Sequence, residues 1–244
     1  GYEAYFCEDF TDHMEPYMEQ WKERGFVPDG IYTGFLSDEK QADKILKFMD
    51  MFAAEDTLIL TDPVMGDDGE VYPIYTEALR RRFCELVKRS CVITPNLTEA
   101  LVLLYGKEKM KTVWKEFQTI TGQERLERIE ETGRKLAEEF SLSAVVITGV
   151  DQQEEGETVK MGNLVLENGK CSWVFAEKAG GSYSGTGDIF ASILSAGLVK
   201  GYSMEACADM AVDFISASIR DAVKEGTDRN DGVCFELHLG RLVR

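Results

Sequence analysis

The sequence predicts an α/β protein with a doubly wound, mostly parallel central sheet that is flanked by helices. Short runs rich in Val, Ile and Leu alternate with longer segments that carry apolar residues at helical spacing. The short runs are apolar at consecutive positions, which is typical of parallel strands that are buried on both faces. Neither an internal repeat nor a Pro/Gly-rich linker interrupts this alternation, so we expect one domain over residues 1–244.

The individual elements follow from turn and capping residues at their ends. A hairpin of antiparallel strands is expected over residues 157–176, because the apolar alternation there turns around Asn168-Gly169. The charged stretch 107–128 has two interpretations, a mobile excursion or the more ordinary solvated face of a helix. The expected parallel strands cover residues 31–36, 57–63, 91–95 and 144–149, and the expected helices cover 38–53, 75–88, 96–105, 124–140, 186–200 and 204–224.

The composition excludes several classes of partner. The chain has 27 Lys and Arg residues against 44 Asp and Glu residues, which gives a formal net charge of −17. Such a charge opposes binding to nucleic acid or to an anionic membrane surface. A phosphorylated ligand would have to be held by local means, such as backbone N–H groups, helix N-termini and a divalent cation.

The six cysteines are scattered without a Cys-x-x-Cys pair, and the chain has only two histidines. This pattern makes a zinc site improbable and indicates a reducing compartment, so we expect a cytoplasmic protein. No apolar stretch reaches the length of a membrane span, and no charged-then-apolar leader opens the chain. The first residue is Gly1 rather than Met, so we expect the natural N-terminus to lie outside this sequence.

The most informative stretch is the Gly-rich run 180–188, which feeds directly into an apolar helical pattern. A glycine turn at a helix start leaves several N–H groups unpaired, and the helix dipole there favours negative charge, so we expect an anion site. Asp188 at the end of the run has two interpretations. It is either a simple N-terminal cap or a base beside a phosphoryl group.

Polar residues follow each expected parallel strand, and ligands in open α/β sheets bind at these strand ends. We therefore expect Asp62, Thr94, Thr148 and the Gly-rich run to converge on one cleft. The spacing of Asn96 and Glu99 fits a capping box; alternatively, Glu99 and Asp62 position water-coordinated Mg²⁺ over nucleotide phosphates. Asp62 and Asp67 also have the simpler interpretation of residues that begin a turn.

Other nucleotide and nucleophile signatures are missing. The sequence contains no Gly-x-x-x-x-Gly-Lys-Ser/Thr, and the run around Gly185 lacks the third glycine of a dinucleotide fingerprint. No histidine lies in the loops that are expected to form the cleft, which argues against a hydrolase triad.

Three motifs occur in order along the chain: Asp-Pro-Val-Met-Gly-Asp at 62–67, Thr-Pro-Asn-Leu-Thr-Glu-Ala at 94–100 and Ser-Gly-Thr-Gly-Asp at 184–188. Together they resemble the ribokinase-like superfamily, in detail its pyridoxal/pyridoxamine kinase branch. The resemblance implies ATP-dependent phosphorylation of the 5′-hydroxyl of pyridoxal, pyridoxine or pyridoxamine. It also implies a cytosolic homodimer, with Mg²⁺ as cofactor and K⁺ as a candidate second cation.

The resemblance also implies roles for individual residues. Asp188 would take the proton of the substrate hydroxyl, while Gly185, Thr186 and Gly187 would offer N–H groups to the transferring phosphoryl, as such a transfer requires. From their own chemistry, Tyr32 and Phe35 suit stacking on a pyridine ring, although aromatic residues more often serve a core. The residues that the resemblance assigns to ATP are Asp62, Thr94, Asn96, Glu99, Thr148, Gly149, Phe175 and Ala176, with Asp62 and Glu99 holding Mg²⁺ through water.

One departure from the family is at the N-terminus. The first β-α unit of the family, which contributes contacts to the pyridoxal ring, is absent from this sequence. Two alternatives to a vitamin B6 kinase remain, a hydroxymethylpyrimidine kinase and a catalytically silent protein that binds nucleotide or pyridoxal phosphate. The first of these branches typically carries Cys at the position of Asp188, and the second does not need an intact Gly185–Asp188 turn.

Overall fold

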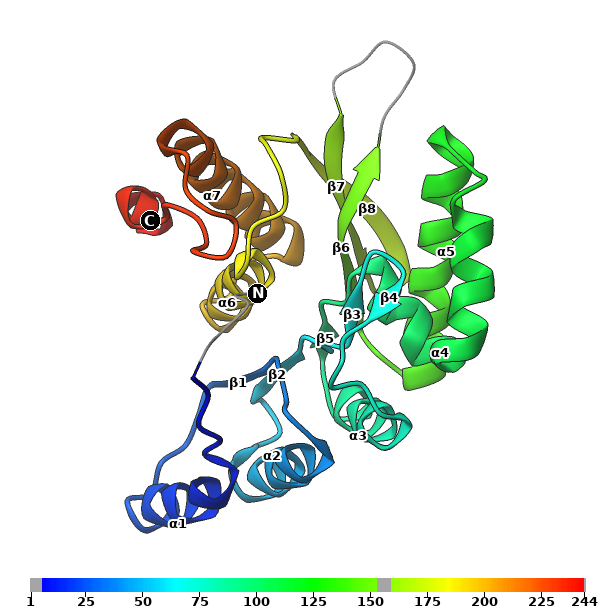
Figure 1. Ribbon diagram of the computed structural model, residues 1–244. Coiled ribbons are helices and arrows are strands. Elements are labelled where there is room, and N and C mark those ends of the chain that lie inside the picture. The colour runs from blue at the N-terminus through cyan, green and yellow to red at the C-terminus, as the bar shows by residue number, and fades with distance from the viewer. Residues whose placement is uncertain (1–5, 153–158, 244) are drawn as a thin grey trace.

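The computed structural model describes residues 6–152 and 159–243 of the chain. Its centre is a six-stranded sheet with the order β1-β2-β5-β6-β7-β8 (Figure 1). The pairs from β1 to β6 are parallel, and β7 and β8 are added antiparallel. The expected doubly wound, mostly parallel sheet with a small hairpin is thereby confirmed. The strands are β1 (Gly30–Thr33), β2 (Leu58–Thr61), β5 (Val92–Ile93), β6 (Ala144–Gln152), β7 (Lys160–Glu167) and β8 (Lys170–Glu177).

Helices connect the strands, and several begin where the sequence offers a cap. The side chain of Asp38 accepts a hydrogen bond from the backbone at the start of α2, and that of Thr76 does the same for α3. The helices are η1 (Thr11–His13), α1 (Met14–Glu23), α2 (Glu39–Phe52), α3 (Glu77–Lys88), α4 (Leu97–Phe117), α5 (Gly122–Phe140), α6 (Thr186–Val199), α7 (Met204–Glu225) and η2 (Glu236–Leu242).

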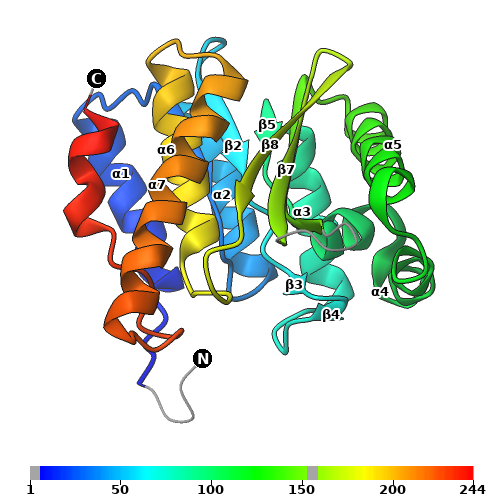
Figure 2. The same cartoon turned by 90° about the horizontal axis from the view of Figure 1, so that it is seen from above.

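The helices cover the two faces of the sheet. On one face, α6 packs against β1 and β2, and α7 packs against β7 and β8. On the other face, α4 and α5 pack against β6, and α2 and α3 continue this layer beside them (Figure 1). Figure 2 shows α6 and α7 side by side on their face, with the C-terminal η2 against α7.

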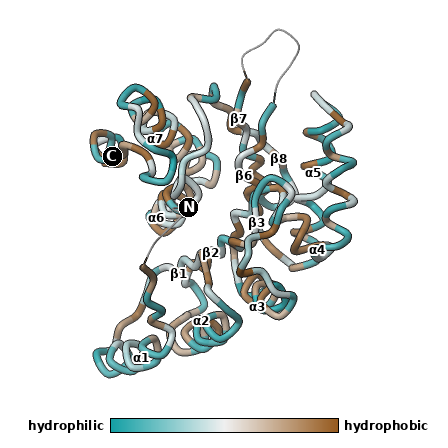
Figure 3. Tube along the Cα trace, in the orientation of Figure 1, coloured by the Kyte–Doolittle hydropathy of each residue, from teal (hydrophilic) through white to brown (hydrophobic). Residues whose placement is uncertain are grey.

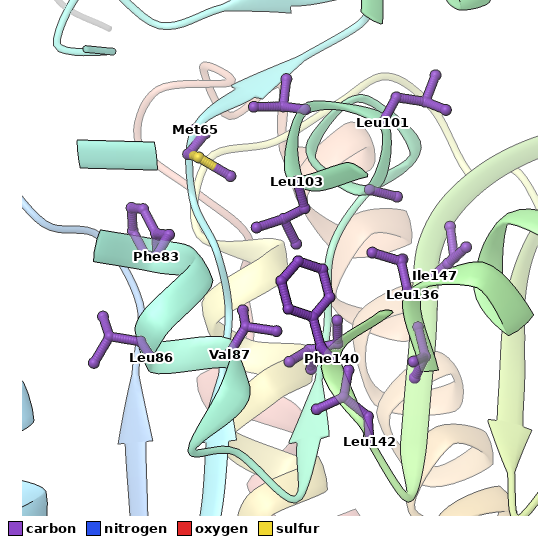
Figure 4. Packing of buried hydrophobic residues seen from close by; sticks show 14 of the residues in the cluster. Met65, Phe83, Leu86, Val87, Leu101, Leu103, Leu136, Phe140, Leu142 and Ile147 are labelled. Carbon is purple, nitrogen blue, oxygen red and sulfur yellow. The ribbon is translucent and has the colours of Figure 1, made fainter. Parts of the chain in front are cut away.

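Two hydrophobic cores lie on the two faces, and strand alternation assigns residues to them. Val145 and Ile147 of β6 belong to the core under α3, α4 and α5, whereas Ala144 and Val146 belong to the core under α6 and α7. In Figure 4, Phe140 of α5 lies among apolar side chains from α3 and α4. Figure 3 shows hydrophobic residues along the sheet and hydrophilic residues on the outer sides of the helices. Because both faces are buried, the strands read as continuous apolar runs.

Several parts of the chain differ from the sequence expectation. Helix α4 does not end near residue 105 but continues past a kink at Gly106. The charged stretch 107–128 is therefore helical apart from the connection at 118–121, which agrees with the ordinary interpretation as a helix rather than with an excursion. The short helix α1 and the two-stranded hairpin of β3 (Gly66–Asp67) and β4 (Glu70–Val71) were not expected. The expected beginning of the larger hairpin, residues 157–158, lies outside the described residues.

Within residues 6–152 and 159–243, every helix is either too short or too polar to cross a membrane.

Candidate active site

Parallel pairing brings the polar strand ends to one edge of the sheet. Thr33 of β1 is in register with Thr61 of β2, and Thr61 is in register with Ile93 of β5. The residues that follow these strands, among them Asp62 and Thr94, therefore leave the sheet at the same edge. The convergence that the sequence predicted follows from this register.

Asp62 is a buried carboxylate at this edge. The residue is 7% exposed, and the hydroxyl of Thr94 donates a hydrogen bond of 3.1 Å to its Oδ1. Burial raises the pKa of Asp62 to about 7, and the negative charge of Asp188 adds to this rise while the Thr94 hydrogen bond opposes it. Asp62 therefore holds a proton more readily than an exposed aspartate does.

Glu99 forms the capping box that its spacing from Asn96 predicted. Its Oε2 accepts the backbone N–H of Asn96 at 2.9 Å, and the Asn96 side chain accepts the backbone N–H of Glu99 at 2.9 Å. The other oxygen, Oε1, accepts the backbone N–H of Met65 at 3.1 Å. Burial, and after it the charge of Asp62, raise the pKa of Glu99, whereas the two N–H donors lower it. The capping interpretation is confirmed, and the link to Met65 goes beyond it.

The start of α4 also fixes the β3–β4 hairpin. The Asn96 amide donates to the carbonyl oxygen of Gly66 at 2.8 Å, and the Thr98 hydroxyl accepts the backbone N–H of Gly69 at 2.8 Å. Asp68 and Gly69 have φ values of 47° and 78°, the backbone of a tight hairpin turn. These bonds hold the β3–β4 hairpin, residues 66–71, in place beside this edge of the sheet. We call this hairpin the flap.

The Gly-rich run ends in the first turn of α6. Gly185 is the N-cap residue with a left-handed φ of 82°, and no side chain caps the helix. The first N–H groups of any α-helix have no acceptor within the helix, and in α6 no side chain at the N-cap replaces it. Asp188 lies within the first turn rather than at the N-cap, so its interpretation as a simple cap is wrong. Unpaired N–H groups of this kind suit an anion, and the anion site at this run stays a prediction.

These features line one cleft of about 1290 Å³. Most of the residues predicted for the site lie in its wall. Those that line the cleft are Asp62, Thr94, Asn96, Glu99, Thr148, Gly149, Ala176, Gly185, Thr186, Gly187 and Asp188.

Three predicted residues do not line this cleft. Phe175 stacks on Trp173 with ring centroids 5.5 Å apart and an interplanar angle of 11°. Phe35 is 59% exposed, and Tyr32 instead places its hydroxyl 3.1 Å from Oδ1 of Asp188. Neither Tyr32 nor Phe35 lies in the wall of this cleft, and their stacking on a substrate ring stays a prediction.

Basic residues in the cleft wall were missed by sequence reasoning. They are Arg125 from the first turn of α5, Lys178 at the end of β8 and Arg229 in the loop after α7. Lys178 pairs with Asp151 at 2.6 Å. Lys178 lies close to the Gly-rich run in the sequence, and this proximity in a strongly acidic chain was the available signal. Arg125 and Arg229 enter the cleft only through the folding of distant segments.

The donor set fits a cation that arrives with phosphates. No cluster of three or more His, Cys, Asp or Glu side chains able to hold a metal occurs among the residues that the structure describes. Mg²⁺ typically uses one or two carboxylates together with waters and substrate phosphates. Asp62 and Glu99 supply buried oxygen ligands of this kind, and both oxygens of Glu99 already accept backbone N–H groups. Glu99 therefore suits contact through water.

The fold and the site define a class. The doubly wound sheet is that of the ribokinase-like proteins, and here its strand ends bring buried carboxylates to an uncapped helix N-terminus. Residues 23–232 match the family described as phosphomethylpyrimidine kinase, and the chain belongs to that family.

Individual relatives agree with this assignment. The chain is 30% identical over 169 residues to the pyridoxine kinase of Bacillus subtilis (strain 168), a match that covers 67% of this chain and 54% of the relative. The chain thus spans about half the length of that curated relative. It is similar to a candidate phosphomethylpyrimidine kinase of Bacteroides thetaiotaomicron VPI-5482 crystallised with pyridoxal, with 28% identity, a TM-score of 0.85, and coverage of 100% of this chain and 80% of that one. The pyridoxal kinase of Lactobacillus plantarum shares the fold at 22% identity and a TM-score of 0.81, over 100% of this chain and 81% of that one.

Proposed function

We propose that the protein catalyses ATP-dependent phosphorylation of the 5′-hydroxyl of a B6 vitamer, pyridoxal, pyridoxine or pyridoxamine. The observation that carries the proposal is the position of Asp188 in the uncapped first turn of α6, in the same cleft as the buried Asp62. A Cβ atom built on Gly187 would lie 3.9 Å from Oδ2 of Asp62, so this turn faces that carboxylate across a short gap. The proposed base Asp188, the proposed anion site in the first turn of α6 and the carboxylate of Asp62, which could contact a cation, are then adjacent.

In the proposed reaction, Asp188 accepts the proton of the substrate hydroxyl. The alcohol oxygen forms a bond to the γ-phosphorus of ATP as the bond from that phosphorus to the β,γ-bridging oxygen breaks, and ADP leaves. The N–H groups of Gly185, Thr186 and Gly187 donate to the oxygens of the transferring phosphoryl. Mg²⁺, when bound, neutralises phosphate charge.

The other residues of the cleft hold the nucleotide and its ion. We assign Thr94, Asn96, Thr148, Gly149 and Ala176 to the ATP side, since all of them line the cleft. Asp62 and Glu99 would hold the hydration shell of the ion. With so many carboxylates in the wall, a polyphosphate without its cation would be repelled.

We further propose that the protein acts in the cytosol as a homodimer and that its chain forms a single catalytic domain. All six cysteines are unpaired, which fits a reducing compartment. The homodimer, and K⁺ as a second cation, follow from the family resemblance.

A second candidate activity is phosphorylation of hydroxymethylpyrimidine, and the description of the matching family favours it. Both substrates are flat nitrogen heterocycles with a primary alcohol, so the same base and anion site would serve either.

A coupled ADP-release assay on the complete protein, run with pyridoxal, pyridoxamine and hydroxymethylpyrimidine, tests the proposal. We expect release with the B6 vitamers at the higher kcat/KM. Preference for hydroxymethylpyrimidine would instead support the second candidate. Tight nucleotide or pyridoxal phosphate binding without ADP release from any alcohol would identify a silent binding protein and overturn both.

A further inference from the structure

Tyr32 lies on the α6 side of the sheet. It is in β1, where alternation buries Ile31 in the core under the opposite helices, and the Tyr32 ring packs against the core under α6 and α7. Helix α6 packs directly on β1. The end of the phenol side chain thereby reaches the first turn of α6.

The Tyr32 hydroxyl donates a hydrogen bond of 3.1 Å to Oδ1 of Asp188. Within the described residues, the Asp188 carboxylate has no other hydrogen-bond partner. Burial, and after it the charges of Asp62 and Asp188, raise the pKa of Tyr32 far above its usual value. The phenol therefore stays protonated at any working pH and can only donate to the carboxylate.

Gly34 leaves the room that this pair needs. A Cβ atom built at Gly34 would lie 3.0 Å from the Tyr32 hydroxyl oxygen and 3.6 Å from Oδ1 of Asp188. The first distance is shorter than ordinary van der Waals contact, and the second is an ordinary contact. The backbone of Gly34 is not in the left-handed region, so an alanine would be resisted only by the side chains it meets.

We infer that Tyr32 is a positioning residue for Asp188, and that Gly34 keeps the space in which the two side chains meet. The hydroxyl holds Oδ1, so that the carboxylate presents its other oxygen, Oδ2, to the substrate alcohol. Without this bond, an aspartate in an open helix turn samples several rotamers. Holding one rotamer keeps the carboxylate oriented for reaction, which lowers the entropic part of the barrier. The inference rests on the proposed role of Asp188 as the base.

The first test is Tyr32→Phe, which removes the hydroxyl and keeps the ring. We expect kcat to fall by about 10- to 100-fold, the size of a hydrogen bond to a charged group, with KM for ATP and the melting temperature unchanged. Tyr202→Phe, at an exposed tyrosine in the turn between α6 and α7 with no hydrogen bond to its hydroxyl among the described residues, is the matched control and should keep full activity. A Tyr32→Phe enzyme with kcat within twofold of wild type would overturn the inference.

The second test couples the two positions. Gly34→Ala should lower kcat in the wild-type background, because its methyl group displaces the hydroxyl. In a Tyr32→Phe background it should have no further effect, because the nearest remaining atoms, Cζ of residue 32 and Oδ1 of Asp188, are 3.6 Å away. Losses that multiply in the double variant would mean that Gly34→Ala acts elsewhere and would contradict the inference.

A structural readout avoids dependence on turnover. A crystal structure of Tyr32→Phe should show the Asp188 carboxylate displaced or in several rotamers, and an unchanged single position would count against the inference. Asp188→Asn distinguishes a failure of the proposed base from a failure of the positioning role of Tyr32. If that variant keeps full turnover, the proposed base is wrong; if it is inactive while Tyr32→Phe keeps full kcat, only the positioning role fails.

Discussion

The hydroxyl of Thr94 donates its 3.1 Å hydrogen bond to Asp62 from the end of the neighbouring strand, and both side chains are almost fully buried. This bond stabilises the ionised form of Asp62, yet burial outweighs it, because the pKa still rises to about 7. In this cleft, desolvation is therefore the larger influence on the carboxylate. A cation brought by a nucleotide would reverse that balance.

The first prediction concerns stability and pH. Asp62 titrates near 3.8 in the unfolded chain and at about 7 in the folded one, so between these values the folded protein holds a proton that the unfolded chain has lost. The contribution of Asp62 to the free energy of unfolding therefore has its full value below about pH 4. It is lost as the pH rises toward about 7. We expect Asp62→Asn, which never ionises, to gain melting temperature relative to wild type over this range.

Thermal unfolding of both proteins without nucleotide, from about pH 4.5 to about pH 8, measures this difference. Subtracting the two curves removes the general effect of the acidic composition. A difference that stays constant with pH would show that Asp62 keeps an ordinary pKa.

The second prediction concerns the base. Asp188→Asn should lower kcat by about 10²- to 10⁴-fold, the range for removal of a general base, while the affinity for Mg-ATP stays within a few-fold. The reason is that Asp188 acts on the alcohol in the transition state and not on the nucleotide. Single-turnover kinetics and calorimetric titration separate the two effects.

Asp209→Asn serves as the control for Asp188→Asn. Asp209 is an exposed aspartate of α7 outside the cleft, with no hydrogen bond or ion pair within the part of the chain that the structure describes. Equal losses in the two variants would point to a general charge effect instead of a base.

The sequence was sufficient for the sheet and for most of the cleft. Apolar runs predicted a parallel sheet, and strand-end residues such as Asp62 and Thr94 predicted a cleft at its edge, because a buried strand and its polar end are both local patterns. The β3–β4 hairpin escaped prediction because its strands have two residues each, too few for any periodicity. The continuation of α4 beyond Gly106 was missed because a glycine there reads as a helix end.

The roles of single side chains were harder to predict from the sequence. Tyr32 was interpreted either as a residue that stacks on a substrate ring or as a core residue. The direction of its hydroxyl group has no signal in the sequence around a strand end. Its contact with Asp188 spans 156 positions in the chain and depends on how α6 lies on β1. Arg125 enters the cleft wall for a similar reason, through the corner between α4 and α5.

The third prediction concerns Glu99→Gln. A glutamine keeps one acceptor oxygen, so its amide NH₂ would oppose one of the two backbone N–H groups, those of Met65 and Asn96, that Glu99 now accepts. We expect the free energy of unfolding to fall by about 1–3 kcal/mol, measured by urea denaturation. If Glu99 also holds the hydration shell of Mg²⁺, the Mg²⁺ concentration for half-maximal activity should rise.

Glu205→Gln is the comparison for Glu99→Gln. Glu205 also lies in the first turn of a helix, α7, but it is exposed and makes no hydrogen bond or ion pair among residues 6–152 and 159–243. An unchanged Mg²⁺ titration with reduced stability would mean that Glu99 caps the helix and does not contribute to the Mg²⁺ site. Unchanged stability would contradict the structural role itself.

The fourth prediction concerns the flap. Gly69 has a φ of 78°, and a Cβ atom there would overlap the indole ring of Trp114 in the second half of α4. Gly25 has a similar φ of 65°, but no atom lies within 4 Å of its Cβ position. Both alanine variants meet the left-handed strain, of about 1–2 kcal/mol, and only Gly69→Ala meets the ring. We therefore expect Gly69→Ala to lose at least about 1 kcal/mol more unfolding free energy than Gly25→Ala and to change the Trp114 fluorescence. Equal losses would mean that Trp114 moves aside freely and that α4 does not brace the flap.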